Sequence, residues 1–117
     1  MEKLVGFDNW ISLANLCVGG LPQYGTVYGV YAMRSRSTGE ILYIGSTDNL
    51  RRRIFGNYLG GVGGETTQRL HKLLFYEGKI VEVELAWEET DKYRQKESEL
   101  KDEYRKEHGR LPKWNKI

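Results

Sequence analysis

The chain has 117 residues, of which 39% are hydrophobic and 29% charged, and its formal net charge is +2. This length fits one domain with a modest core, and the composition excludes an intrinsically disordered chain. No apolar run approaches the ~20 residues that a membrane span needs, and the N-terminal residues lack the pattern of a signal peptide, so we expect a cytoplasmic protein with no membrane partner.

Cysteine and histidine are too scarce for a structural zinc site of the usual kind. Cys17 is the only cysteine, which excludes an internal disulfide, and the two histidines, His71 and His108, are far apart in the sequence. A bound metal would therefore take oxygen ligands, which favours Mg²⁺ or Mn²⁺.

The first half of the sequence predicts a helix, a β-hairpin and a second helix. Residues 8–17 carry apolar side chains at helical spacing. Residues 26–33 and 40–45 are rich in β-forming residues and flank a polar turn. The next helix is expected over residues 48–58, with Asp48 as its N-cap.

The second half predicts two helices around a third strand. A glycine-rich loop over residues 60–64 precedes a helix that ends at Gly78. Alternating residues then predict a strand over residues 79–87, and a last helix is expected over residues 90–108. The order α-ββ-αα-β-α predicts an α+β domain, in which helices flank a small three-stranded antiparallel sheet.

The hairpin pattern brings two tyrosines close to two glycines. If the turn is symmetric about Ser37, Tyr31 faces Tyr43 on the sheet. Gly29 then faces Gly45, so that two phenols border a notch that no side chain fills. An aromatic pair in an ordinary sheet is the alternative interpretation.

Two charged residues lie at core-facing positions of predicted helices. Arg53 lies beside the inward stripe of its helix, where a guanidinium needs an anion, either a phosphate or an internal carboxylate. Glu97 lies between Tyr93 and Leu100 on the inward stripe of the last helix. A carboxylate at such a position is either paired within the protein or bound to a metal, and the sequence leaves both interpretations open.

Taken in order, these residues resemble the GIY-YIG nuclease superfamily. The matching elements are Gly29-Val30-Tyr31, Tyr43-Ile44-Gly45, Arg53, Glu97 and, in a Trp-Asn pair, Asn115. The resemblance spans residues 26–115, which we expect to form the catalytic core of a single domain covering residues 1–117, with residues 1–24 as an N-terminal helical extension.

The sequence departs from the family pattern at two positions. Val30 replaces the isoleucine of the first triplet, and Asn57 stands where many members carry a histidine one turn after the arginine. His71 in the next helix is a candidate substitute, and a surface histidine is the alternative interpretation.

The resemblance implies a metal-dependent DNA endonuclease that hydrolyses phosphodiester bonds, one strand per active site. Glu97 would hold Mg²⁺ or Mn²⁺, and Arg53 would neutralise charge on the phosphate in the transition state. Tyr31 would accept a proton from the attacking water, Tyr43 would position the water or the phosphate, and Asn115 would order the site. Contacts to the nucleic acid are expected at Gly29, Gly45, Ser46, Arg51, Arg52 and His71.

Two other functions remain open at this stage. The domain could be a catalytically weak nucleic-acid-binding module, against which the intact set of candidate catalytic side chains counts. It could also be a structural domain that acts in protein assembly, for which no salt-dependent affinity for DNA is expected. Because one such site cuts one strand, double-strand cleavage would need a homo-oligomer, sequential nicking or a second catalytic module.

Overall fold

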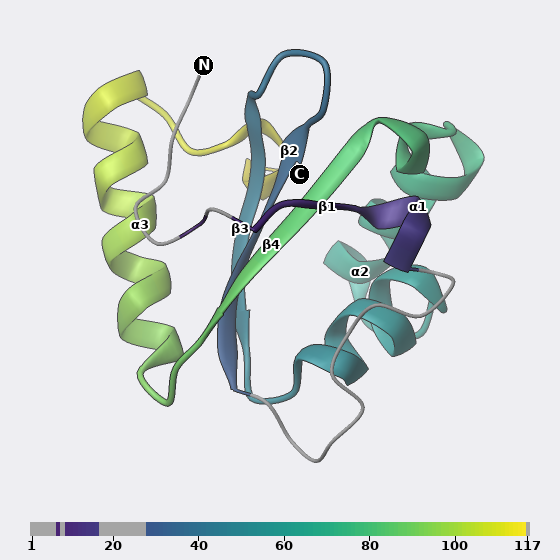
Figure 1. Cartoon of the computed structure of the whole chain (residues 1–117), viewed down its shortest axis with the longest axis horizontal. Helices are drawn as coiled ribbons and strands as arrows, with labels where there is room; N and C mark the ends of the chain where they lie inside the picture. The colour runs from purple at the N-terminus through teal and green to yellow at the C-terminus, as the bar shows by residue number, and fades with distance from the viewer. Residues whose placement is uncertain (1–6, 8, 17–27, 117) are drawn as a thin grey trace.

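A computed structural model of the chain describes residue 7, residues 9–16 and residues 28–116 (Figure 1). Its centre is a four-stranded sheet in the order β1-β4-β2-β3, with every neighbouring pair antiparallel. The strands are β1 (Ile11–Ser12), β2 (Gly29–Ser35), β3 (Ile41–Thr47) and β4 (Val83–Glu89). The α+β class and the antiparallel sheet are as predicted, with one strand more than expected.

The additional strand comes from the segment that was expected to be a helix. Among the described residues 9–16, only α1 (Leu13–Leu16) is helical, whereas Ile11 pairs with Leu85 along the edge of β4. This pairing satisfies backbone groups that an uncovered edge strand would leave open. Leu13 and Leu16 are fully buried, and burial of a leucine side chain contributes about 1.5–3 kcal/mol. The expected helix ends, Asp8 and Cys17, lie outside the described residues.

The β2–β3 hairpin has a different register from the symmetric one predicted. Tyr31 lies opposite Gly45, and Met33, instead of Tyr31, lies opposite Tyr43. An irregularity after Met33, which leaves Leu42 without a partner on β2, accounts for one residue of this shift, and the turn, which pairs Arg34 with Ile41, accounts for the other. Tyr31, Tyr43 and Gly45 keep the shared face on which they were expected, whereas Ile41, on the other side of the irregularity, packs with Val30 and Ile44 on the opposite face.

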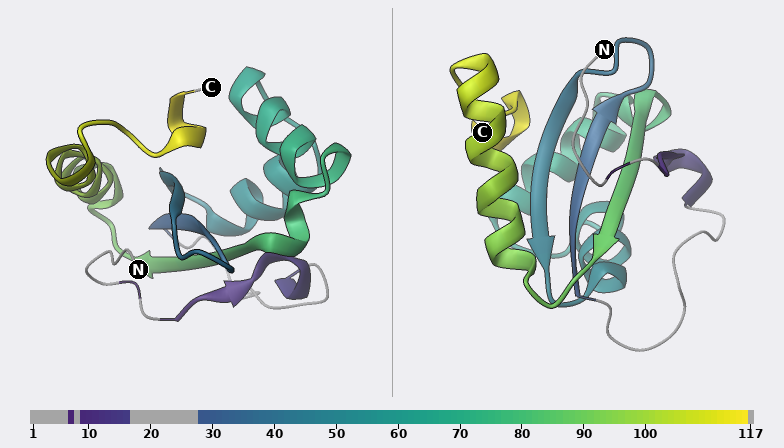
Figure 2. Two further views of the ribbon diagram at one scale, coloured as in Figure 1. Left: turned by 90° about the horizontal axis from the view of Figure 1, so that it is seen from above. Right: turned by 60° about the vertical axis from the view of Figure 1, so that its left-hand side comes forward.

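Helices cover both faces of this sheet (Figures 1 and 2). On one face, Val30 and Ala32 pack against Leu100 and Tyr104 of α3 (Tyr93–His108). The other face carries a π-helix, η1 (Arg52–Leu59), followed by α2 (Glu65–His71) and a second π-helical segment, η2 (Lys72–Tyr76). None of the helices in the described part of the chain is long and apolar enough to cross a lipid bilayer.

The helix expected over residues 48–58 differs in its cap and in its winding. The Asn49 side chain, rather than that of Asp48, accepts the backbone N–H of Arg52 at 3.0 Å. Asp48 instead pairs with the Arg52 guanidinium at 2.6 Å. The segment then winds as η1, whose hydrogen bonds span five residues where those of an α-helix span four.

The strand expected over residues 79–87 begins later, at Val83. Val83 lies opposite Ser35, the last residue of β2, so the preceding residues have no strand to pair with. They form the 3₁₀ turn η3 (Lys79–Glu82) instead. The last helix begins at Tyr93 and ends, as predicted, before Gly109, which has a φ of 71°.

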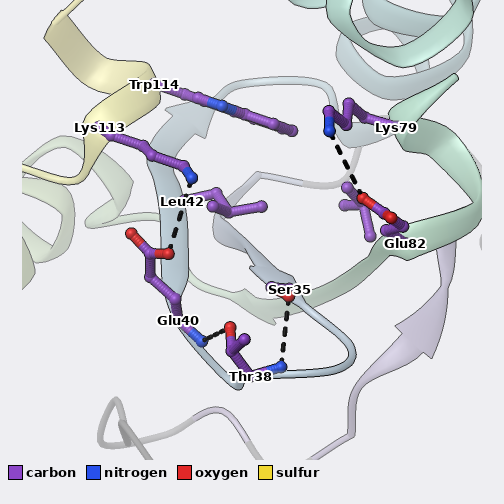
Figure 3. A pocket seen from close by; sticks show the side chains of 9 residues that line it. Ser35, Thr38, Glu40, Leu42, Lys79, Glu82, Lys113 and Trp114 are labelled. Carbon is purple, nitrogen blue, oxygen red and sulfur yellow. Dashed lines mark hydrogen bonds and ion pairs between the residues drawn. The ribbon is translucent and has the colours of Figure 1, made fainter. Parts of the chain in front are cut away.

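The C-terminal 3₁₀ turn, η4 (Lys113–Lys116), returns to the sheet beside the hairpin. Its Trp114 is 7% exposed and forms one wall of a cavity of about 190 Å³ (Figure 3). Glu40 and Lys113 form one ion pair at its rim, at 3.7 Å, and Lys79 pairs with Glu82 at 3.8 Å. These charges compensate one another, so the main effect of this packing is to anchor η4 against β3.

Candidate active site

A second cavity, of about 230 Å³, brings together most of the candidate catalytic residues. It lies at β3, the outer strand of the sheet, and side chains from η1, α2 and α3 complete its walls. Its lining consists of Tyr31, Tyr43, Gly45, Ser46, Arg53, Tyr58, Thr66, Thr67 and Glu97. Tyr31, Tyr43, Arg53 and Glu97 come from four different elements, so the cavity depends on the complete fold.

Gly45 makes room for the first tyrosine of the site. A Cβ atom at Gly45 would lie 2.6 Å from Cζ and from the hydroxyl of Tyr31, and 2.9 Å from Cε2 of Tyr43. Real Cβ atoms do not approach other atoms so closely. The glycine thus allows the Tyr31 ring to cross directly over β3, which explains the need for glycine at this position.

Three phenols meet above Gly45. The Tyr31 hydroxyl lies 2.5 Å from the Tyr58 hydroxyl, and the Tyr31 and Tyr43 rings are stacked with centroids 6.2 Å apart. Burial raises the pKa of Tyr31 well above its usual value, and Tyr58 and Tyr43 add to this effect, while Arg53 opposes it. Burial and Tyr58 also raise the pKa of Tyr43. Both phenols are therefore neutral at physiological pH.

Tyr58 was missed as a site residue because its place on the inward stripe of the predicted helix, with Leu50 and Ile54, indicated a core side chain. In an α-helix the residue one turn after Arg53 is Asn57, the position at which the sequence departs from the family pattern. In η1 the hydrogen bonds span five residues, so Tyr58 follows Arg53 on the same side and reaches the cavity. Asn57 instead donates from its side chain to the Val62 carbonyl at 2.5 Å.

Arg53 has an unused donor in this cavity. Its Nε atom is buried and has no hydrogen-bond partner among the described residues. The guanidinium carbon lies 5.8 Å from the centroid of the Tyr58 ring, and none of the ion pairs in the described part of the chain includes Arg53. An unsatisfied buried donor costs about 1–3 kcal/mol. The internal carboxylate that the sequence left open is therefore not found, and the geometry favours an external anion.

Glu97 reaches the same cavity from α3. The Ser46 hydroxyl donates to its Oε1, and Lys101 Nζ lies 2.5 Å from its Oε2. No cluster of three or more His, Cys, Asp or Glu side chains occurs among the described residues, so a cage of several such protein ligands is not found there. Mg²⁺ keeps several waters and binds through one or two carboxylates with substrate phosphates. The Glu97 carboxylate, with the Ser46 hydroxyl beside it, fits such an ion.

Asn115 lies outside the cavity and holds the strand that forms its floor. Its side-chain oxygen accepts the Ile44 N–H at 2.9 Å, and its side-chain nitrogen donates to the Ile44 carbonyl, also at 2.9 Å. The amide thus takes the place of a neighbouring strand at the outer edge of β3. Ile44 lies between Tyr43 and Gly45, so this pair of bonds positions both.

The other residues expected to contact nucleic acid do not line the cavity, apart from Gly45 and Ser46. Gly29 is buried, and a Cβ atom there would lie 2.9 Å from both the Glu88 carbonyl oxygen and Leu50 Cδ1. Its close packing against Leu50 means that the expected notch is formed by Gly45 without Gly29.

The remaining three lie on the helical side of the site. Arg51 is exposed and its guanidinium lies 5.4 Å from the Phe55 ring centroid, while the side chain of Arg52 is 56% exposed. His71 lies behind the cavity, where its Nδ1 is 2.8 Å from the Tyr58 carbonyl oxygen. His71 therefore supports η1 rather than replacing the missing histidine.

With this geometry established, comparison with known proteins defines the class. The sequence profile of the GIY-YIG catalytic domain matches residues 27–110, and the chain belongs to the GIY-YIG family. Over 69 residues, or 59% of the chain, it is 36% identical to the UvrABC system protein C of Trichlorobacter lovleyi. The chain spans only 10% of the length of that relative. No solved structure matches the chain.

Proposed function

We propose that the chain is a divalent-metal-dependent DNA endonuclease that hydrolyses one phosphodiester bond at the cavity formed by Tyr31, Tyr43, Arg53, Tyr58 and Glu97. The observation that carries this proposal is the buried, unpartnered Nε of Arg53 in a cavity lined by phenols and a carboxylate. Such a donor is a strong partner for a phosphate oxygen, and its cost to stability is offset when the phosphate binds.

In this proposal Arg53 binds the scissile phosphate and neutralises the charge that grows on it in the transition state. Loss of one such donor typically slows an enzyme about 10²–10³-fold. Glu97, with Ser46 beside it, holds Mg²⁺ or Mn²⁺ at the other side of the cavity. The bound ion supplies a Lewis acid that polarises a phosphoryl oxygen and acidifies water.

The role expected for Tyr31 changes in this proposal. A general base needs a pKa near the working pH, whereas burial and the neighbouring phenols raise the pKa of Tyr31 well above 10. The Tyr31 and Tyr58 hydroxyls share one hydrogen bond, so we assign the pair as a neutral group that donates its remaining proton to the phosphate or the attacking water. Tyr43, whose pKa is also raised, positions the same ligands. Asn115 acts through β3 and does not touch the substrate.

The described residues form one such site, which would cut one strand, so double-strand cleavage would need a second site or a second event. Arg51 and Arg52 are exposed on the side of the cavity formed by the start of η1, where they can contact backbone phosphates on either side of the cut. These contacts predict a DNA affinity that falls as salt rises.

A plasmid-nicking assay with a matched pair of variants tests this function. We expect the wild type to nick supercoiled DNA with Mg²⁺ or Mn²⁺ but not with EDTA. Glu97→Gln removes the carboxylate charge at the cavity, whereas Glu99→Gln changes an exposed acid on the same helix. Glu97→Gln should abolish nicking and Glu99→Gln should retain it, with both variants folded by circular dichroism. Nicking in EDTA, or full nicking by folded Glu97→Gln, would contradict the proposal.

The same assay separates the nuclease from a catalytically weak binding module. Such a module would bind DNA in a salt-dependent manner and leave the plasmid intact with every divalent metal. The unpartnered Arg53 is compatible with phosphate binding alone, but the Glu97 carboxylate facing the same cavity favours hydrolysis.

A further inference from the structure

Both oxygen atoms of the Glu97 carboxylate already have partners within the chain. The Ser46 hydroxyl donates to Oε1, and the Lys101 ammonium lies 2.5 Å from Oε2. Lys101 follows Glu97 by one helical turn of α3, and the side chains are 27% and 23% exposed. This ion pair is therefore half-buried, next to the group that the proposed function assigns to the metal.

We propose that Lys101 is an internal counter-ion that competes with the divalent cation for Glu97 and thereby sets the metal affinity of the site. The inference rests on the proposed role of Glu97 as the metal ligand. Lys101 is a positioning residue in this account, because it acts through Glu97 and does not line the cavity.

Geometry and charge both support competition. An ammonium at 2.5 Å occupies the space that a cation bound to Oε2 would take, and two cations on one carboxylate repel each other. The pair cannot simply persist beside the metal, so Lys101 must leave Oε2 when the ion binds there. Its partial exposure leaves it a path to solvent. The positive charge of Lys101 also lowers the pKa of Tyr43, against the rise that burial causes, so Lys101 lies close enough to influence the site.

The pair has a use when no metal is bound. Without Lys101, the half-buried Glu97 carboxylate would keep only the hydrogen bond from Ser46, and its charge would have no counter-ion, which is unfavourable. Lys101 pairs with the carboxylate and holds it in place, and as a consequence the metal binds less tightly. Because the metal affinity is limited in this way, the ion binds mainly when a substrate phosphate supplies further ligands.

Titration with Mn²⁺ alone, followed by the electron paramagnetic resonance signal of the free ion, tests this competition without measuring cleavage. Lys101→Met keeps the aliphatic stem and removes the charge, and Lys101→Arg keeps the charge. Lys106→Met removes a charge from an exposed position on the same helix and is the matched control. Glu97→Gln tests the assignment of the ligand itself.

We expect Lys101→Met to bind Mn²⁺ about fivefold more tightly than the wild type, as removal of an ion pair worth about 1 kcal/mol predicts. Lys101→Arg and Lys106→Met should bind with wild-type affinity, and Glu97→Gln should lose the binding. If Glu97→Gln loses binding while Lys101→Met binds no more tightly than Lys106→Met, the role of Lys101 is overturned and the proposed function stands. If Glu97→Gln binds Mn²⁺ as the wild type does, both proposals fall.

Discussion

Replacement of Arg53 by methionine should raise stability and destroy activity at the same time. Methionine keeps the unbranched stem and removes a buried donor that has no partner in the described structure. Removal of such a donor should stabilise the protein by about 1–3 kcal/mol, and loss of the cation–π contact with the Tyr58 ring should destabilise it by about 0.5–1 kcal/mol. We therefore expect Arg53→Met to be more stable by about 1 kcal/mol, or about 4 °C in melting temperature.

The matched control is Arg52→Met, one residue away on the same helix. Arg52 pairs with Asp48, but the two side chains are 56% and 52% exposed, so the pair contributes little. Arg52→Met should change stability by less than about 0.5 kcal/mol, and because Arg52 lies outside the cavity it should lower DNA affinity but keep the nicking rate at saturating DNA.

Urea unfolding and plasmid nicking, measured on the same preparations, decide the matter. Arg53→Met should nick at least about 100-fold more slowly than the wild type. A stability that is lower than that of the wild type would mean that Arg53 has an internal partner, and unchanged nicking would mean that it does not act on the phosphate. Either result refutes the reasoning.

Three further predictions concern the floor of the site and its tyrosines. Gly45→Ala should destabilise the protein by about 2–4 kcal/mol in urea unfolding, because its Cβ would overlap the Tyr31 ring and break the contact with Tyr58. Gly56→Ala, whose Cβ meets nothing closer than 3.8 Å, should be neutral or slightly stabilising, and equal stability of the two variants would contradict this packing. Asn115→Ala removes two hydrogen bonds to β3 and should destabilise the protein by about 1–3 kcal/mol and slow nicking. Nicking at the wild-type rate would show that β3 keeps its position without the Asn115 side chain. Because burial raises the pKa of both Tyr31 and Tyr43 on folding, their contribution to stability should be constant below pH 10 and fall above it by up to about 1.4 kcal/mol per pH unit for each phenol. Tyr31→Phe should roughly halve this loss, which phenols with an ordinary pKa would not produce.

Much of the fold follows from local patterns in the sequence. The polar turn of the hairpin, the glycines that end α3 and η2, and the alternating strands were all predicted within a few residues, because each depends on neighbours in the chain. The short strand β1 could not be predicted in this way. It forms because β4 offers an open edge, and this becomes apparent only when the sheet order is known.

The site shows the same division between local and non-local causes. The positions of Tyr31, Arg53 and Glu97 around one cavity followed from a motif whose order was read along the chain. The part that Tyr58 takes in the site was not predicted, because an inward tyrosine on a helix is ordinarily a core residue and its contact with Tyr31 depends on the tertiary fold. The Lys101 partner of Glu97 was available at i+4 spacing, but many such pairs occur on exposed helices and its relevance depends on where the carboxylate lies.

The central claim is that a DNA phosphate binds the buried side of Arg53, and the nitrogen-15 signal of its Nε–H group tests this most directly. The signal is assigned by its loss in Arg53→Lys, and a short DNA duplex is titrated in the presence of EDTA to prevent cleavage. The account predicts a saturable downfield shift of the Arg53 proton at the same DNA concentrations that shift Arg51 and Arg52. A signal that stays in place while those of Arg51 and Arg52 move would show that DNA binds elsewhere on the surface and would contradict the claim.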